Sequence, residues 1–250
     1  MYPLLPWKVL SVPLVLLTAC AVYFDELLQA IGYDVSDQAI VRYLPPLAMG
    51  FVSLMFGLTC YYAPWRFVWR VVPWLNKLFP DLNGVWVGAT SSNWPKIKKL
   101  IDCSQSAETI TEQDLFNLPE QSNTIAIQIK SSLFRLSVEA ILTSTDGEAY
   151  SITAKPWRHQ HTKDIHLSYV YRQENPSHAH TDEESHLGAA DLILRAGKYN
   201  EANGFYWTKR RWKEGRNTAG TIELKRVSDK LVSIRELRAR AEEQKGKVGY

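Results

Sequence analysis

The chain begins with two long stretches that contain no charged side chain, residues 9–24 and 43–62. A helix needs about 20 apolar residues to cross a bilayer. We therefore expect residues 1–80 to form a transmembrane region with two α-helices. A cleaved signal peptide would explain only the first stretch, and residues 23–26 offer no small-residue cleavage site.

Charged residues on either side of these stretches predict their orientation. Residues 25–37 between them contain four acidic residues and no Lys or Arg, whereas Arg66, Arg70 and Lys77 follow the second stretch. By the positive-inside rule, both termini face the cytoplasm. Only Cys103 lies beyond the two stretches, so the polar part cannot form an internal disulfide, which agrees with a reducing compartment.

Small residues and aromatic residues mark the second stretch and its end. Gly50, Ser53 and Gly57 recur on a roughly helical spacing that would allow close packing of transmembrane helices. Trp and Arg residues then alternate over residues 65–79, a pattern typical of a short amphipathic helix at the membrane interface. Such a segment is either a stiff collar or a lever that couples movement of the next domain to the helices.

From residue 81 onward, short segments alternate apolar and polar residues, and turn formers such as Asn203-Gly204 separate them. Eight strands without a long helical crossover favour a closed barrel over an open sheet, with room for one small ligand. We expect an all-β, antiparallel, eight-stranded minimal barrel of the lipocalin-like kind. The expected strands are 85–90, 124–130, 134–143, 149–154, 165–171, 187–195, 204–210 and 221–226.

Two segments lack the strand pattern. Residues 97–118 are expected to form a helix or a lid. Residues 228–244 place a few apolar residues among many charges and predict a solvated C-terminal helix. The expected organisation is therefore a membrane region at 1–80, a ligand-binding barrel at 81–226 and a charged helix or tail at 227–250.

A tryptophan flanked by glycines opens the first strand. Gly84 and Gly88 lie on the same strand face as Trp86, as occurs where a barrel strand bends sharply. We interpret Trp86 as a plug that closes one end of the barrel, in preference to a ligand contact.

Candidate binding groups recur at every second position of two strands. One set is Tyr206, Thr208 and Arg210, and the other contains Tyr169 and Tyr171. Alternation does not decide which face points inward, because the opposite face of the first set is also apolar. If these sets line the barrel, they offer stacking surfaces, hydroxyl groups and one guanidinium for a phosphate. The alternative is ordinary cross-strand pairing with Arg210 in solvent.

The sequence lacks the familiar catalytic motifs. It has no glycine-rich phosphate loop, nucleophile elbow or spaced cysteine pair, so we expect no catalytic residues and no enzymatic activity. Six histidines fall within residues 159–186, and His159 and His161 could share a strand face as metal ligands. His178 and His180 lie in a polar loop where nothing holds their geometry, so we expect no metal site. The net charge of +3 is too small to indicate binding to DNA or RNA.

The order of these elements, with several short motifs, resembles the two-transmembrane, β-strand-rich effectors associated with CD-NTase enzymes of CBASS anti-phage defence. The resemblance extends from the first apolar stretch to about Arg226. The motifs are Leu82-Asn83-Gly84-Val85-Trp86-Val87-Gly88, Ser91-Ser92-Asn93-Trp94, His186-Leu187-Gly188-Ala189-Ala190, Gly204-Phe205-Tyr206-Trp207-Thr208-Lys209-Arg210 and Gly220-Thr221-Ile222-Glu223-Leu224.

The resemblance implies a cytoplasmic barrel that binds a cyclic nucleotide, here a cyclic dinucleotide, and needs no cofactor. A CD-NTase makes this ligand after infection, without a required direct contact. The helices then form a homo-oligomer and disrupt the bacterial inner membrane, which kills the infected cell. The positions that match the motifs, and are expected to bind ligand, are Ser91, Ser92, Trp94, His186, Tyr206, Thr208 and Arg210.

Two other classes of function fit parts of the pattern. The barrel size and the Gly-x-Trp start suit a membrane-tethered, lipocalin-like carrier of an apolar ligand. The histidine cluster suits a metal hydrolase. Lipid that copurifies with the chain would favour the carrier, and a metal-free preparation would exclude the hydrolase.

Overall fold

The computed structural model describes residues 61–71, 73, 80–106, 108–132, 134–144, 147–176 and 183–248, with isolated positions among the first 53. It divides into two compact units, residues 1–81 with 132–135, and residues 82–131 with 136–250. Among the residues that the structure describes, no helix has the length and apolar character needed to cross a membrane.

Most of the two predicted membrane helices lies outside the described residues. Gly57 is among the residues not described. Gly50 and Ser53 are helical and exposed, and a Cβ atom built on Gly50 would meet no atom within 4 Å. Close helix packing at these positions therefore stays a prediction.

The segment that follows the second apolar stretch forms helix α4 (Tyr62–Val71). Its Trp65 and Trp69 are buried, with ring centroids 5.1 Å apart. The guanidinium of Arg66 lies 5.7 Å from the centroid of the Tyr62 ring. The predicted helix is therefore present over these ten residues, and its place at a membrane interface stays a prediction.

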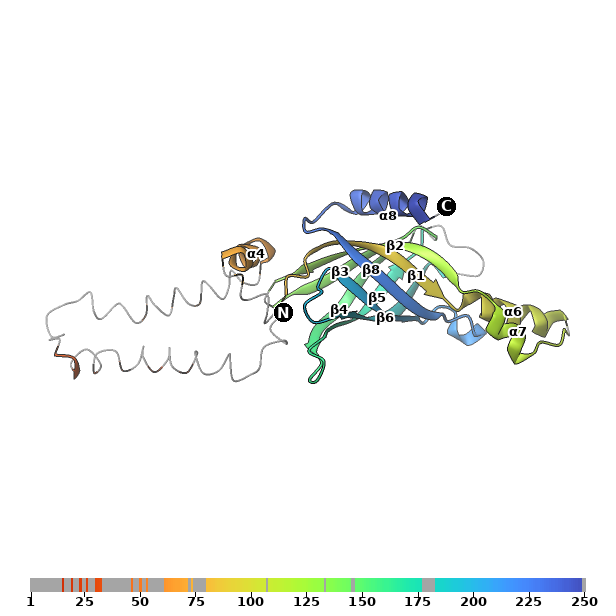
Figure 1. Cartoon of the computed structure of the whole chain (residues 1–250), viewed down its shortest axis with the longest axis horizontal. Coiled ribbons are helices and arrows are strands. Elements are labelled where there is room, and N and C mark those ends of the chain that lie inside the picture. The colour runs from red at the N-terminus through yellow and green to blue at the C-terminus, as the bar shows by residue number, and fades with distance from the viewer. Residues whose placement is uncertain are drawn as a thin grey trace. The chain divides into compact units, whose positions relative to one another are not determined.

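Eight antiparallel strands form a closed barrel in which each strand pairs with its neighbours in sequence and β8 pairs with β1 (Figure 1). The predicted eight-stranded antiparallel barrel is thus confirmed. The strands are β1 (Gly84–Ser92), β2 (Gln121–Ser131), β3 (Leu136–Leu142), β4 (Glu148–Arg158), β5 (Ile165–Glu174), β6 (Ser185–Leu194), β7 (Glu201–Thr208) and β8 (Ala219–Ser228).

Several strand boundaries differ from the prediction, and two strands are shorter than expected at one end, next to a turn. β3 starts after a tight turn in which Ser132 N donates to Arg135 O at 2.7 Å. β7 ends at Thr208, and the next residue, Lys209, donates its N–H to Leu187 O at 2.7 Å. Arg211 then adopts a left-handed conformation with φ of 38° and leads into the 3₁₀ turn η2 (Trp212–Glu214).

One end of the barrel is filled by apolar side chains around Trp86. The indole is fully buried, and its Nε1–H donates to Leu82 O at 3.1 Å. Gly84 has φ of +125°, and a Cβ atom there would lie 2.0 Å from Ser228 O, so only glycine fits where β8 crosses so closely. The structure confirms that Trp86 plugs this end.

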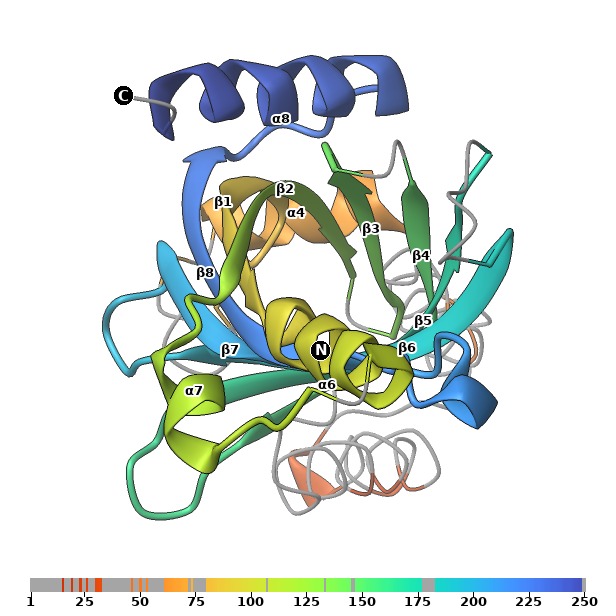
Figure 2. The same cartoon turned by 90° about the vertical axis from the view of Figure 1, so that its right-hand side faces the viewer.

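Two helices follow β1 at the opposite end of the barrel. Helix α6 (Trp94–Ser106) lies across this end, with α7 (Glu112–Asn117) beside it (Figure 2). Lys99 and Glu108 form an ion pair of 2.9 Å that joins α6 to the segment before α7. The expected helix or lid at residues 97–118 is therefore a pair of helices.

Helix α8 (Ile234–Val248) packs on the outer wall of the barrel. Its Leu237 and Ala241 are fully buried against the outward side chains of β1, β2 and β3. Before the helix, Val232 N donates to Gln128 Oε1 at 2.6 Å. The helix was correctly predicted, but its description as solvated was wrong, because one narrow face is part of a second hydrophobic core outside the barrel.

Leu237→Ala is expected to lower the free energy of unfolding by about 3 kcal/mol, because it leaves a cavity between α8 and the sheet. Urea unfolding followed by tryptophan fluorescence measures the change. The control is Leu100→Ala on α6, where 46% of the side chain is exposed and the expected loss is below about 0.5 kcal/mol. Equal losses in the two variants would show that α8 contributes no packing.

Candidate functional site

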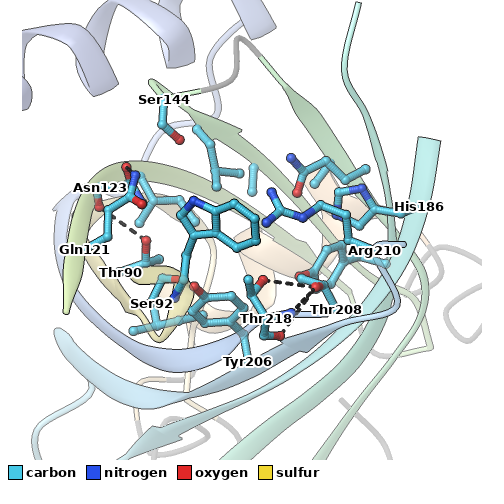
Figure 3. A pocket seen from close by; sticks show the side chains of 18 of the residues that line it. Thr90, Ser92, Gln121, Asn123, Ser144, His186, Tyr206, Thr208, Arg210 and Thr218 are labelled. Atoms are coloured by element: carbon cyan, nitrogen blue, oxygen red, sulfur yellow. Dashed lines mark hydrogen bonds between the residues drawn. The ribbon is translucent and has the colours of Figure 1, made fainter. Parts of the chain in front are cut away.

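A cavity of about 320 Å³ opens inside the barrel at the end that carries α6 (Figure 3). Its volume lies in the lower part of the ~300–1,000 Å³ range of small-molecule sites. Residues from all eight strands, with one from α6 and three from connecting segments, line it. They are Thr90, Ser92, Trp94, Gln121, Asn123, Ile125, Val138, Ala140, Leu142, Ser144, Ala149, Tyr169, Tyr171, Gln173, His186, Tyr206, Thr208, Arg210, Thr218 and Ile222.

The structure settles which strand faces point inward. Tyr206 and Thr208 of β7 line the cavity, whereas Phe205 and Trp207 are more than half exposed on the outside. On β5, Tyr169 lines the cavity in the same way. Although Phe205 and Trp207 are apolar, they face outward because the opposite face of β7 contributes Ala202 and Gly204 to the packed interior.

Arg210 and Trp94 form a cation–π pair at the cavity. The guanidinium carbon lies 4.8 Å from the centroid of the indole ring. Ser92 Oγ, at the end of β1, accepts a hydrogen bond from Trp94 N at 3.2 Å and so holds the first residue of α6. A guanidinium is planar, and a cation–π contact with an aromatic ring holds it in place, which suits bidentate binding of a phosphate.

Three tyrosines supply neutral hydroxyl groups to the cavity. Burial raises the pKa of Tyr169 and Tyr171 well above the usual range. Burial also raises the pKa of Tyr206, and a hydrogen bond with Ser92 acts in the opposite direction. The phenols therefore stay protonated at neutral pH and act as hydrogen-bond donors.

Thr208 and Thr218 join the ends of β7 and β8. Thr218 N donates to Thr208 Oγ1 at 3.0 Å, and the two hydroxyl oxygens lie 3.0 Å apart. This pair holds the two strands together on either side of the turn that contains Arg210. The predicted Thr208 hydroxyl thus lines the cavity and is already hydrogen-bonded within it.

Of the predicted ligand-binding residues, only Ser91 does not line the cavity. Strand alternation places Thr90 and Ser92 inside and Ser91 on the outer face of β1. The assignment of Ser91 to the site is therefore corrected. His186 of β6 is buried and lines the cavity, as expected.

Three side-chain amides that were not predicted as binding groups also line the cavity. Gln121 and Asn123 precede the predicted start of β2, and Gln173 follows the predicted end of β5. Both strands are longer than predicted, so these polar residues were taken for loops. The signal that could have found Gln173 is the continuation of the alternate set that contains Tyr169 and Tyr171.

The charge of the cavity comes from one side chain. Arg210 is the only Arg or Lys among the lining residues of the described barrel, and none of these residues is Asp or Glu. A lining with one cation, many neutral donors and no carboxylate favours an anionic ligand.

The histidine pair suspected as metal ligands lies elsewhere. His159 and His161 occupy the turn after β4, so they do not share a strand face as expected, and their ring centroids are 5.9 Å apart. His159 Nδ1 accepts a hydrogen bond from Thr162 N at 3.2 Å. Within the described part of the chain, no group of three His, Cys, Asp or Glu residues could hold a metal ion. His178 and His180 lie outside the described residues.

Gly188→Ala is expected to lower ligand affinity about tenfold, because a Cβ atom there would lie 2.4 Å from the ring of Tyr171 and 2.8 Å from Trp207 O. The ring would move within the cavity. Calorimetric titration checks the affinity, and the control is Gly246→Ala on α8, where the built Cβ meets no atom within 4 Å. Unchanged affinity in Gly188→Ala would mean that the position of Tyr171 does not affect binding.

Comparisons with known proteins agree with the expected family. A family model described as the Cap15 cyclic dinucleotide receptor domain matches residues 77–226. CD-NTase-associated protein 15 from Escherichia albertii is 30% identical over 149 residues, which span 60% of this chain and 63% of that relative. The matched region contains all eight strands except the last two residues of β8. The chain therefore belongs to the Cap15 cyclic dinucleotide receptor family, and the resemblance to CD-NTase-associated effectors is confirmed.

Proposed function

We propose that this chain is a CBASS effector whose barrel senses a cyclic dinucleotide. The observation that carries the proposal is the cavity at the α6 end, where a receptor-family barrel brings together one stacked guanidinium, protonated phenols and side-chain amides. A cyclic dinucleotide is a small dianion with two bases. The guanidinium, the phenols and the amides of the cavity each suit a different part of this ligand.

The match between cavity and ligand can be argued group by group. The Arg210 guanidinium suits a phosphodiester, and the aromatic rings of Trp94 and Tyr171 suit the faces of bases. The hydroxyl and amide groups suit base edges and ribose oxygens. The apolar residues Val138 and Ile222 also line the cavity and suit the apolar parts of the ligand.

The proposal assigns no catalysis to the barrel. The lining contains no Cys, Lys, Asp or Glu that could serve as a nucleophile or a carboxylate base within the described residues. The free energy of ligand binding can then drive the change from the isolated chain to an assembled form. A ligand shifts an equilibrium only by its difference in affinity for the two states, so the assembled form must bind it more tightly than the isolated chain.

We extend the proposal to the N-terminal part of the chain. The two uncharged stretches support an anchor in the bacterial inner membrane with both termini in the cytoplasm. A CD-NTase supplies the ligand by diffusion. Ligand binding then drives homo-oligomerisation of the membrane helices, disruption of the bilayer and death of the infected cell.

Isothermal titration of the full chain in mild detergent with a panel of cyclic dinucleotides tests the sensor. We expect saturable binding of at least one of them. In bacteria, the full chain with its ligand is expected to depolarise the membrane, and a chain that lacks residues 1–80 is not. Absence of nucleotide binding, with an apolar lipid bound in the cavity, would instead support the lipocalin-like carrier.

A further inference from the structure

Gln173 occupies a defined place in the wall of the cavity. It belongs to β5, follows Tyr169 and Tyr171 on the inward face, and is 5% exposed. Its partner in the pairing of β5 with β6 is His186, which also lines the cavity. An amide at such a position can present either its oxygen or its nitrogen to a ligand, and the two have opposite hydrogen-bonding character.

The orientation of this amide is set by Asn175. The side chain of Asn175 is fully buried, and its Nδ2 donates to Glu183 O at 3.1 Å. A backbone carbonyl only accepts, so the nitrogen of Asn175 must face Glu183 and its Oδ1 must face Gln173. That oxygen requires a donor, which is Gln173 Nε2 at 2.8 Å.

The consequence is that Gln173 Oε1 lies on the side of the amide away from Asn175. A turned-over Asn175 amide is disfavoured, because it would set Oδ1 against Glu183 O, and two acceptors cannot form a hydrogen bond. The Glu183 carbonyl thus fixes the orientation of the Asn175 amide, and Asn175 in turn fixes the orientation of the Gln173 amide. An amide oxygen has two lone pairs, so Gln173 Oε1 can accept a hydrogen bond from a ligand in addition to one from the protein.

We propose that Gln173 selects the base of the ligand by accepting a hydrogen bond from an exocyclic amino group, and that Asn175 is the positioning residue that sets this preference. This inference rests on the proposed function. Adenine, guanine and cytosine carry such an amino group, whereas hypoxanthine carries a carbonyl in place of the amino group of adenine, and uracil one in place of the amino group of cytosine. A carbonyl placed against Oε1 would leave two acceptors facing each other.

The test compares cyclic dinucleotides that differ in this group. Hypoxanthine lacks the 2-amino group of guanine and has a carbonyl in place of the 6-amino group of adenine. Calorimetric titration of the full chain with cyclic di-AMP, cyclic di-GMP, cyclic di-IMP and cyclic di-UMP therefore isolates the amino group. We expect the better of the first two ligands to bind at least tenfold more tightly than the last two.

Two variants connect this preference to the residue. Gln173→Met keeps the length of the side chain and removes the acceptor, so the preference over cyclic di-IMP is expected to fall below about threefold. Gln113→Met makes the same change on the exposed face of α7, where Gln113 bonds only to Asn117 among the contacts seen, and should keep the full preference.

The outcomes separate this inference from the proposed function. Equal or tighter binding of cyclic di-IMP or cyclic di-UMP by the unmodified chain would overturn the role of Gln173, and this measurement needs no variant to fold. A preference that persists in Gln173→Met would also overturn it. In both cases the chain would still be a cyclic dinucleotide sensor. Failure of all four ligands and of every other cyclic dinucleotide to bind would overturn both.

Discussion

Arg210→Ala is expected to weaken cyclic dinucleotide binding about a hundredfold. Arg210 is the only Arg or Lys that lines the cavity within the described barrel, and its guanidinium stacks on Trp94. Loss of one partner from a buried, hydrogen-bonded charge pair costs about 2–5 kcal/mol. About 2.7 kcal/mol corresponds to a hundredfold change in Kd. Isothermal titration of the full chain measures this change.

Two further variants identify the cause. Arg210→Lys keeps the charge but loses the planar guanidinium, so an intermediate loss of about tenfold is expected. Lys213→Ala, in the exposed turn η2, removes one positive charge outside the cavity and should change Kd less than threefold. If Arg210→Ala binds as tightly as Lys213→Ala, the ligand phosphates do not contact Arg210, and the site must be placed elsewhere.

The barrel could be predicted because one face of each strand is buried. Apolar and polar residues alternate along such a strand, and all eight segments were recognisable. The strand ends were harder. Gln121, Asn123 and Gln173 point into the mouth of the barrel, where polar residues face inward to meet a ligand. At a binding site the usual rule of apolar side chains inside fails, and the sequence then looks like a loop.

The inward face of β7 could not be predicted for a related reason. Phe205 and Trp207 are exposed, so both faces of this strand carry large side chains. Strand pairing decides the question, because Tyr206 pairs with inward residues of β6 and β8, and Thr208 pairs with an inward residue of β6. Arg210 lies in the turn beyond the end of β7 and still lines the cavity. The sequence grouped it with Tyr206 and Thr208 only because the strand was expected to continue to residue 210.

Helix α8 shows how a narrow apolar face escapes detection. Its buried positions are Leu237 and Ala241, four residues apart on one side of an otherwise charged helix. Alanine adds little to an apolar pattern, and Ile234, the first residue of the helix, is 41% exposed. The outer walls of β1 and β2 carry Val85, Val87 and Ala126, and this outward apolar patch was the missing signal.

Trp86→Ala is expected to lower the free energy of unfolding by about 4 kcal/mol, the largest stability loss among the variants considered. Removal of a fully buried aromatic ring costs about 3–5 kcal/mol, against a total stability of roughly 5–15 kcal/mol for a domain. The loss would also leave Leu82 O without the indole N–H that it accepts at 3.1 Å. Urea unfolding and the thermal midpoint measure the change, and Trp212→Ala, at a side chain 56% exposed, is the control.

Trp86→Phe separates the stability of the barrel from its binding site. Phenylalanine keeps most of the plug and loses the hydrogen bond, so a loss of about 1–2 kcal/mol is expected with the fold intact. Trp86 pairs with Ile127 and Arg226, whereas the cavity begins four residues further along β1 at Thr90. The Kd of Trp86→Phe for a cyclic dinucleotide should therefore stay within threefold of the unmodified chain. A much larger change in Kd would mean that a substitution at the plugged end alters the ligand cavity. The two ends of the barrel interior would then be structurally coupled.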